Sequence, residues 1–178
     1  LSGLGAGAPK VVLGAPSWFL TDPDQGLKEW TSTYTGTFKK VIEDPRNPTP
    51  SNVVKLVLCT GKVYYDLLEA RESKGIKDVA LVRLEQIYPF PQNALAAQLG
   101  RYPNAEVVWC QDEPQNQGAW FFVQHYIMEN MTEGQKLGYA GRPASASPAV
   151  GYSHLHQDQQ KALIEAAFGK LKGFVLSK

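Results

Sequence analysis

The sequence has no excess of charge of either sign. Its 18 Lys and Arg residues and 17 Asp and Glu residues leave a formal net charge of +1. Binding to nucleic acid needs concentrated basic charge, so this composition gives no reason to expect a nucleic-acid ligand. The chain also lacks an apolar run near the roughly 20 residues that span a bilayer, and it lacks a basic start followed by an apolar stretch. We therefore expect neither a membrane span nor a signal peptide.

Cysteine is scarce as well. Cys59 and Cys110 are the two cysteines, and each lies within or beside an apolar, strand-like run. Together with only three histidines, they do not have the spacing of a zinc site. We predict two free, buried thiols in a reducing compartment, with a disulfide or a reactive thiol as the alternative.

The length allows one domain with appendages. A chain of 178 residues that is 43% hydrophobic can bury a substantial single core. We assign residues 51–178 to this domain and residues 1–50 to an N-terminal arm or linker, of which residues 1–36 are rich in glycine and proline and remain unassigned. The PRNPTP segment at 45–50 predicts a turn-rich linker, and we expect the first strand directly after it.

Strand and helix signals alternate after this linker. β-Branched, apolar runs predict strands, and apolar residues three or four apart predict helices. The expected strands are 53–58, 79–84, 106–111 and a weak 136–140, and the expected helices are 63–74, 92–99 (ended by Gly100), 119–131 and 157–172. Short connections between them predict a three-layer α/β/α fold with a mostly parallel sheet. Ligand and partner contacts should then gather at the strand carboxyl ends, in residues 60–62, 85–86 and 111–120.

Four long motifs at these loops resemble one family. They are CTGKVYY at 59–65, DVALVRLEQIYPFP at 78–91, WCQDEPQNQGAW at 109–120, and YAGRPASASPAVG at 139–151 followed by His156-Gln157. In this order they are similar to the C-terminal domain of the thiamine-diphosphate-dependent 2-oxoglutarate dehydrogenase component, over roughly residues 37–168. The resemblance implies a transketolase C-terminal-like domain.

The resemblance also implies a function for the longer protein. Members of this family are homodimers that decarboxylate 2-oxoglutarate on thiamine diphosphate and Mg²⁺ and succinylate the lipoyl groups of a dihydrolipoyl succinyltransferase core, which works with dihydrolipoyl dehydrogenase. The cofactor is held by preceding domains, and the diphosphate-binding GDG…N pattern is absent here. The resemblance therefore implies a dimerisation and regulatory domain that is inactive alone and binds no cofactor itself. The implied compartment is the bacterial cytoplasm, or the mitochondrial matrix in a eukaryote.

Three residues are candidates for binding an effector such as AMP or acetyl-CoA. Arg142 and Ser145 lie in the RPASASP loop, where a guanidinium and hydroxyls suit a phosphate. The paired arginines of acetyl-CoA-binding relatives are missing here, and a structural role in orienting the loop is the alternative for Arg142. Lys62 precedes a predicted helix start, which attracts anions, although the TGK sequence also suits a tight turn.

The polar loop at 112–118 is a candidate interface. Its candidate contacts are Glu113, Asn116, Gln117 and the following Trp120, because polar loops with an aromatic anchor are typical of subunit or interdomain contacts. Bracing within the domain is the alternative, and catalysis by these carboxylates is the weakest hypothesis. No catalytic residue, cofactor-binding residue or metal ligand is assigned.

Alternatives at the level of the whole chain remain open. A free-standing nucleotide-binding module is motivated by Lys62 and Arg142, and an independent enzyme is less favoured because no complete catalytic constellation is visible. The same domain of a 2-oxoadipate dehydrogenase would have a similar sequence, because substrate-reading residues lie outside this chain.

Overall fold

The domain is built on one mixed sheet of six strands. The computed structural model describes residues 39–170 and 175–177. The strands are β1 (Val41–Ile42), β2 (Lys55–Cys59), β3 (Val79–Leu84), β4 (Glu106–Pro114), β5 (Lys136–Arg142) and β6 (Val175–Ser177), in the order β1-β3-β2-β4-β5-β6. The four central strands are parallel, while β1 and β6 pair antiparallel at the two edges. The prediction of a mostly parallel sheet is confirmed.

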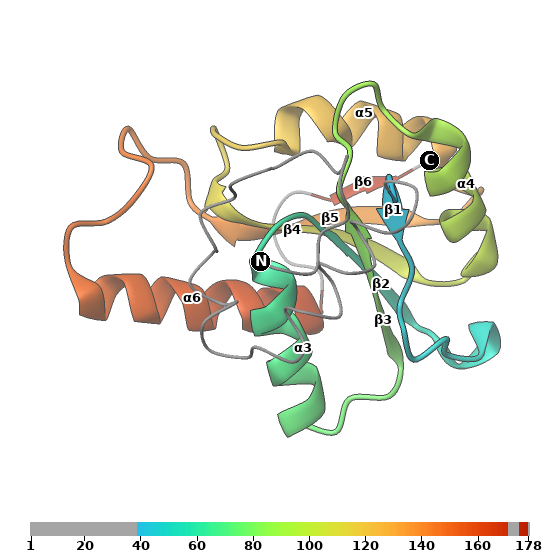
Figure 1. Ribbon diagram of the computed structural model, residues 1–178, viewed down its shortest axis with the longest axis horizontal. Helices are drawn as coiled ribbons and strands as arrows, with labels where there is room; N and C mark the ends of the chain where they lie inside the picture. The colour runs from blue at the N-terminus through green and yellow to red at the C-terminus, as the bar shows by residue number, and fades with distance from the viewer. Residues whose placement is uncertain (1–38, 171–174, 178) are drawn as a thin grey trace, which may run out of the picture. The chain divides into compact units, whose positions relative to one another are not determined.

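Helices cover both faces of this sheet. They are α3 (Val63–Ser73), α4 (Gln92–Arg101), α5 (Trp120–Asn130) and α6 (Ser153–Phe168), with a short 3-10 turn, η1, at Pro50–Asn52. Apolar residues of α4 and α5 pack on one face of the sheet, and those of α3 and α6 pack on the other (Figure 1). All residues of β2 and β3 are buried, which explains why their sequences are nearly continuous apolar runs.

The strand order reverses once, beside β2. From β2 the chain crosses to β3 on one side, and from β3 it returns past β2 to β4 and then β5 on the other side. A crevice forms at such a reversal, outside the carboxyl ends of the strands, and ligands of open α/β sheets bind there. The carboxyl ends of β2 and β4 are therefore the first place to look for a functional site.

Several boundaries differ from the sequence-based expectation. The first strand is β1, which lies before the PRNPTP segment, because a two-residue edge strand leaves no periodic pattern. Gly100 lies inside α4, and β4 continues through Asp112 to Pro114 although these residues are polar. His154 and His156 lie in the first turns of α6, which begins at Ser153, before the expected start at 157. Strand β6 was not predicted at all, and the prediction for residues 1–36 lies outside the described residues.

A buried ion pair fixes the segment after β1. Asp44 and Arg71, from α3, form a salt bridge in which both side chains are fully buried. The Asp44 carboxylate also accepts hydrogen bonds from the backbone amides of Leu81, at 2.9 Å, and Arg46, at 3.0 Å. One carboxylate thus links the entry segment to both α3 and β3.

Candidate functional site

A network of polar side chains lies at the carboxyl ends of β2 and β4, where the strand order reverses, and we call this place the crevice. Lys62, directly before α3, pairs with Asp112 of β4 at 3.5 Å. Gln160, on α6, donates hydrogen bonds to Asp112 at 3.1 Å and to Asp66 of α3 at 2.8 Å. Three elements that are distant in sequence are joined here through one glutamine side chain.

Arg142 extends the same network from the end of β5. Its guanidinium donates to the Gln160 carbonyl oxygen at 2.9 Å, and a second guanidinium nitrogen lies 3.1 Å from Nδ1 of His156. The residue is only 6% exposed, and its Nε has no hydrogen-bond partner. His156 and Gln160 are four residues apart on α6, so they lie on the same face of that helix. The effector candidate Arg142 is therefore held inside the network, whereas the side chain of Lys62 is 58% exposed.

The environment of Asp66 disfavours its charged form. Partial burial raises the pKa of this carboxyl above its ordinary value of 3.8, and the nearby charge of Asp112 acts in the same direction. Lys62 and the hydrogen bond from Gln160 oppose the rise but do not cancel it. Two carboxylates and one exposed lysine thus share a crevice in which the negative charge is imperfectly compensated.

Gln111 braces the polar loop that follows β4. It is fully buried, and its carbonyl oxygen accepts hydrogen bonds from the Trp109 indole at 2.9 Å and from the Trp120 amide at 3.0 Å. Its amide nitrogen donates to the backbone carbonyls of Pro114 and Gln117, at 3.1 and 2.8 Å. Gly118 has a φ of +65°, and a Cβ there would lie 2.9 Å from this amide nitrogen. The hydrogen bonds that hold this loop therefore require Gln111, and the space around them requires a glycine at position 118.

The loops after β4 and β5 are tied to each other. The side-chain amides of Asn116 and Gln117 donate to the backbone carbonyl of Ser145, at 2.9 and 3.0 Å. The Asn116 carbonyl oxygen accepts a hydrogen bond from the Ser145 amide at 2.9 Å. The hydroxyl of Ser145 accepts from the amide of Ser147 at 3.2 Å. The structure thus joins predicted interface residues to a predicted effector residue.

The other two interface candidates differ in their exposure. Glu113 is exposed, and its backbone carbonyl accepts from Gln111 at 3.2 Å. Trp120 is fully buried in the core and lies against Tyr139, with a distance of 5.0 Å between ring centroids. Its side chain has no surface to offer a second subunit, which corrects its assignment as an aromatic anchor.

Several members of the site were not foreseen. Gln160 and Gln111 make most of the hydrogen bonds of the site. Gln160 and its partner Asp66 lie in no motif of the sequence, and Gln111 lies in the motif at 109–120 but was given no role. Gln160 and Asp66 are 94 residues apart, so their contact depends on the packing of α6 against α3.

Both cysteines are free and buried, as predicted. Burial raises the pKa of the Cys59 thiol to about 12 and raises that of Cys110 well above its ordinary value. The nucleophile of a cysteine is the thiolate, so neither residue is activated for chemistry at neutral pH.

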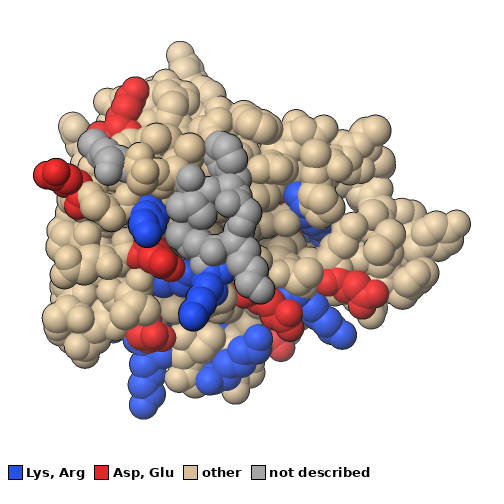
Figure 2. All heavy atoms as spheres, turned by 180° about the vertical axis from the view of Figure 1, so that it is seen from behind, with Lys and Arg blue, Asp and Glu red and all other residues tan. Residues whose placement is uncertain are grey.

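Charge on the surface is mixed in sign. Figure 2 shows Lys and Arg side chains interspersed with Asp and Glu, and no extended basic patch on that face. In the described ranges, no group of three or more His, Cys, Asp or Glu side chains is placed to hold a metal ion. None of the helices described by the structure is long and apolar enough to cross a bilayer.

The order of the strands and the placement of the helices define a class of protein. A parallel sheet with one reversal of strand order, covered by helices on both faces, is a doubly wound α/β domain. The family model for the 2-oxoglutarate dehydrogenase C-terminal region matches residues 29–168. The chain therefore belongs to this family.

Curated relatives agree with this membership. The 2-oxoglutarate dehydrogenase E1 component of Cupriavidus necator is 67% identical over 144 residues, which are 80% of this chain and 15% of that protein. The proteins of the same name from Haemophilus influenzae and Azotobacter vinelandii are 52% and 48% identical, over 74% and 75% of this chain and 14% of each relative. The chain thus spans about one seventh of the length of these relatives.

Proposed function

We propose that this chain is the C-terminal domain of a 2-oxoglutarate dehydrogenase decarboxylating component and that it serves in dimerisation and regulation. The 67% identity to the Cupriavidus necator protein carries this proposal. In this proposal the full-length protein decarboxylates 2-oxoglutarate and succinylates lipoyl groups in the tricarboxylic acid cycle. Its partners are a second copy, the dihydrolipoyl succinyltransferase core and dihydrolipoyl dehydrogenase, in the bacterial cytoplasm.

The cofactor of the full-length enzyme is thiamine diphosphate with Mg²⁺. The carboxylates of the crevice do not fit a magnesium-bound diphosphate, because Asp66 and Asp112 are both engaged by Gln160 and Asp112 also pairs with Lys62. Magnesium prefers an octahedral set of oxygen ligands, including waters and substrate phosphates. We assign the cofactor to the preceding domains, and we assign no chemical step to residues of this chain.

The polar loop after β4 is our proposed subunit contact. Asn116 is exposed in this loop, which Gln111 holds from beneath, and Glu113 is exposed near the end of β4, directly before the loop. A loop that is braced from inside loses little conformational entropy when a partner binds it. Glu113, Asn116 and Gln117 are therefore suited to a polar interface, without the contribution of Trp120.

Regulation by a nucleotide is a second proposed function of the same edge. The exposed ammonium of Lys62 supports it, because this cation lies at a strand-order reversal and beside a helix start. Arg142 would contribute after exchanging its contacts with His156 and Gln160 for a phosphate, and Ser145 lies in the adjoining loop. AMP and acetyl-CoA are the candidate effectors.

A chimera tests the proposed catalytic assignment. The matched stretch of the Cupriavidus necator relative is replaced by residues 29–178 of this chain, and release of CO₂ from 2-oxoglutarate is measured with thiamine diphosphate and Mg²⁺. We expect activity from the chimera and from the unaltered relative. A folded, inactive chimera would contradict the proposal, and a chimera that preferred 2-oxoadipate would support the alternative substrate.

Titration calorimetry tests the regulatory assignment. AMP and acetyl-CoA are each titrated into the chimera, its Lys62→Met variant and its Arg142→Ala variant. We expect about ten-fold weaker binding after loss of either cation, because charge-assisted hydrogen bonds to phosphate contribute about 1.5–3 kcal/mol each. Absence of binding, or binding that is unchanged in both variants, would contradict it.

A further inference from the structure

One exposed surface of the domain is aromatic and uncharged. It comprises Tyr88 in the loop between β3 and α4, and Phe121 and Phe122 on α5, which are 80%, 59% and 36% exposed. We call these three residues, with Phe90 and Tyr126 at their edge, the aromatic surface. Neither the crevice nor the proposed polar interface includes any of them.

Four rings of the aromatic surface form a continuous series, and Phe121 precedes Phe122 directly in α5. Tyr88 meets Phe122 edge to face, with ring centroids 6.4 Å apart, and Phe122 meets Tyr126 at 5.4 Å. Tyr126 stacks on Phe90, with centroids 4.4 Å apart. Single exposed apolar side chains are common on protein surfaces, but a contiguous group rimmed by polar residues marks an interaction site.

Helix α5 is apolar on both of its sides. Trp120, Val123 and Ile127 are buried against the sheet, while Phe121 and Phe122 point outward. The only charged residue between Trp120 and Asn130 is Glu129, and the loop from Gln86 to Pro91 contains none. A polar residue, His125, adjoins these rings, and its ring centroid lies 3.9 Å from that of Tyr126 and 6.2 Å from that of Phe122. Apolar residues on both sides of a surface helix are typical of a position that a partner covers.

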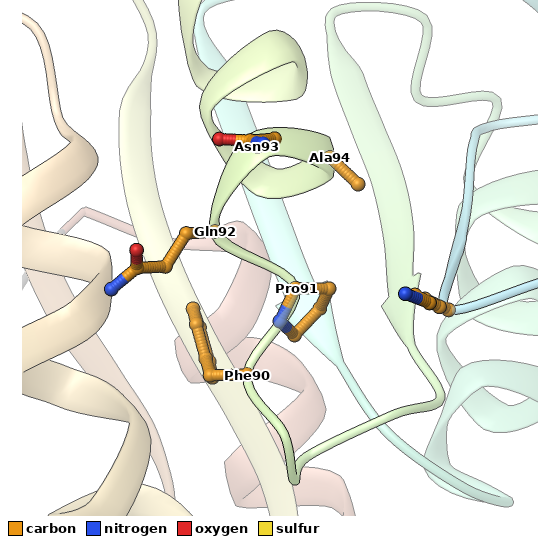
Figure 3. A pocket seen from close by; sticks show the side chains of 6 residues that line it. Phe90, Pro91, Gln92, Asn93 and Ala94 are labelled. Carbon is orange, nitrogen blue, oxygen red and sulfur yellow. The ribbon is translucent and has the colours of Figure 1, made fainter.

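The aromatic surface adjoins the point where the polypeptide enters the domain. The carbonyl of Lys40, directly before β1, accepts hydrogen bonds from the amides of Glu85 and Gln86, at 3.0 and 3.1 Å. These amides begin the loop that carries Tyr88. A cavity of about 320 Å³, lined by Lys40 and residues 90–94, lies at the same place (Figure 3). Phe90 lines this cavity and also stacks on Tyr126.

The relatives indicate what could cover this surface. The matched stretch is 14–15% of each relative, and the family model describes a C-terminal region, so most of each relative precedes it. Polypeptide that enters at Lys40 is tethered beside the aromatic surface. A tethered partner acts at a high effective concentration, which favours this partner over one that must diffuse to the site.

We propose that the aromatic surface is an interdomain interface, covered by an apolar face of the polypeptide that precedes this region in the full-length protein. This proposal depends on the proposed function in one respect, which is that the chain must be part of a longer polypeptide. Burying the three exposed rings would attach the C-terminal domain to the body of the protein.

Hydroxyl-radical footprinting tests this interface. Oxidation of Tyr88 and Phe121 is compared between this chain alone and the chimera with the Cupriavidus necator relative, both in dilute solution. We expect oxidation of both residues to fall about five-fold or more in the chimera, because their side chains leave solvent. Unchanged oxidation would overturn the proposal. Protection in the chain alone that grows with concentration would also overturn it, because a second copy would then cover the rings.

Paired substitutions provide an independent readout. Tyr88→Ser with Phe121→Ser should leave the thermal midpoint of the chain alone within about 2 °C, because both side chains are exposed there. In the chimera the same pair should accelerate proteolysis before residue 39 about ten-fold, whereas Tyr152→Ser, at a residue that is 70% exposed, should not. Equal cleavage of all chimeras would contradict the interface. A protected but inactive chimera would instead contradict only the proposed catalytic assignment.

Discussion

Two clusters of charged residues in this domain are built differently. The side chains of Asp44 and Arg71 are fully buried. Hydrogen bonds that backbone amides donate to the Asp44 carboxylate fix the position of this pair. In the crevice, Lys62 and Asp112 are 3.5 Å apart, with side chains that are 58% and 20% exposed. Asp44 and Arg71 have no room to exchange partners, because both are fully buried. Lys62 and Asp112 can exchange partners at little cost, because they are partly exposed. The difference separates a buried, structural ion pair from a pair of charges that is open to solvent.

The largest effect is expected at the buried pair. Asp44→Ala removes the carboxylate and leaves the Arg71 guanidinium buried without it, so we expect a loss of about 3–5 kcal/mol in the free energy of unfolding. Glu43→Ala is the matched control, because Glu43 is 59% exposed and pairs with Arg101 at 3.1 Å. The control should change stability by no more than about 0.5 kcal/mol in urea denaturation. Similar losses in both variants would remove the distinction between the clusters.

The brace beneath the polar loop should give the next largest effect. Gly118→Ala adds a Cβ that would lie 2.9 Å from the Gln111 amide nitrogen and 3.0 Å from Glu113, at a φ of +65°. Gly134→Ala is the control for backbone strain alone, because its φ is +84° and nothing lies within 4 Å of its added Cβ. We expect losses of about 2–3 kcal/mol for Gly118→Ala and about 1 kcal/mol for Gly134→Ala by thermal denaturation. Equal losses would show that the contact with Gln111 contributes nothing.

A moderate effect is expected where α6 joins the crevice. Gln160→Leu removes the hydrogen bonds to Asp66, Asp112 and Arg142, and we expect it to lower stability by about 1–2 kcal/mol. Gln157→Leu, at an exposed position on the same helix, should be close to neutral. A double-mutant cycle with Arg142→Met should be non-additive, since the two residues are in contact. Additive effects would mean that the network does not act as one unit.

The smallest effect is a dependence on pH at Asp66. Its folded-state pKa is raised above the ordinary 3.8, so the folded protein holds this proton more tightly than the unfolded chain does. Stability is therefore lost as pH rises from the ordinary value through the folded pKa. Asp66→Asn should raise the thermal midpoint at pH 7 by no more than about 1–2 °C, and the gain should disappear below the ordinary pKa. A gain that persists at the lowest pH would show that charge is not its cause.

The sequence predicts the interior of this fold better than its edges. The apolar runs in β2, β3 and β4 and the helical spacing in α3 and α5 reflect burial, and burial leaves a periodic pattern. Strands β1 and β6 have two and three residues and pair antiparallel at the margins, where no such pattern can develop. The polar end of β4 was expected to be a loop, because Asp112 and Glu113 are charged and because the pairing of this end with β5 is irregular.

The sequence predicted where the candidate site lies, but it predicted only some of the residues that form it. The rule for strand carboxyl ends located the crevice, and the family resemblance located the loops that surround it. Trp120 was selected because tryptophan is common at interfaces, yet the register of α5 turns it inward and turns Phe121 outward. Gln160 could not be predicted, because its partners Asp66, Asp112 and Arg142 come from three elements, α3, β4 and β5.

The central claim is that this domain completes a longer polypeptide and has no reaction centre of its own. Release of CO₂ from 2-oxoglutarate by the chain alone, with thiamine diphosphate and Mg²⁺ present, tests this claim most directly. The account predicts no release above the rate without protein, and restored release in the chimera. Turnover by the chain alone would contradict it.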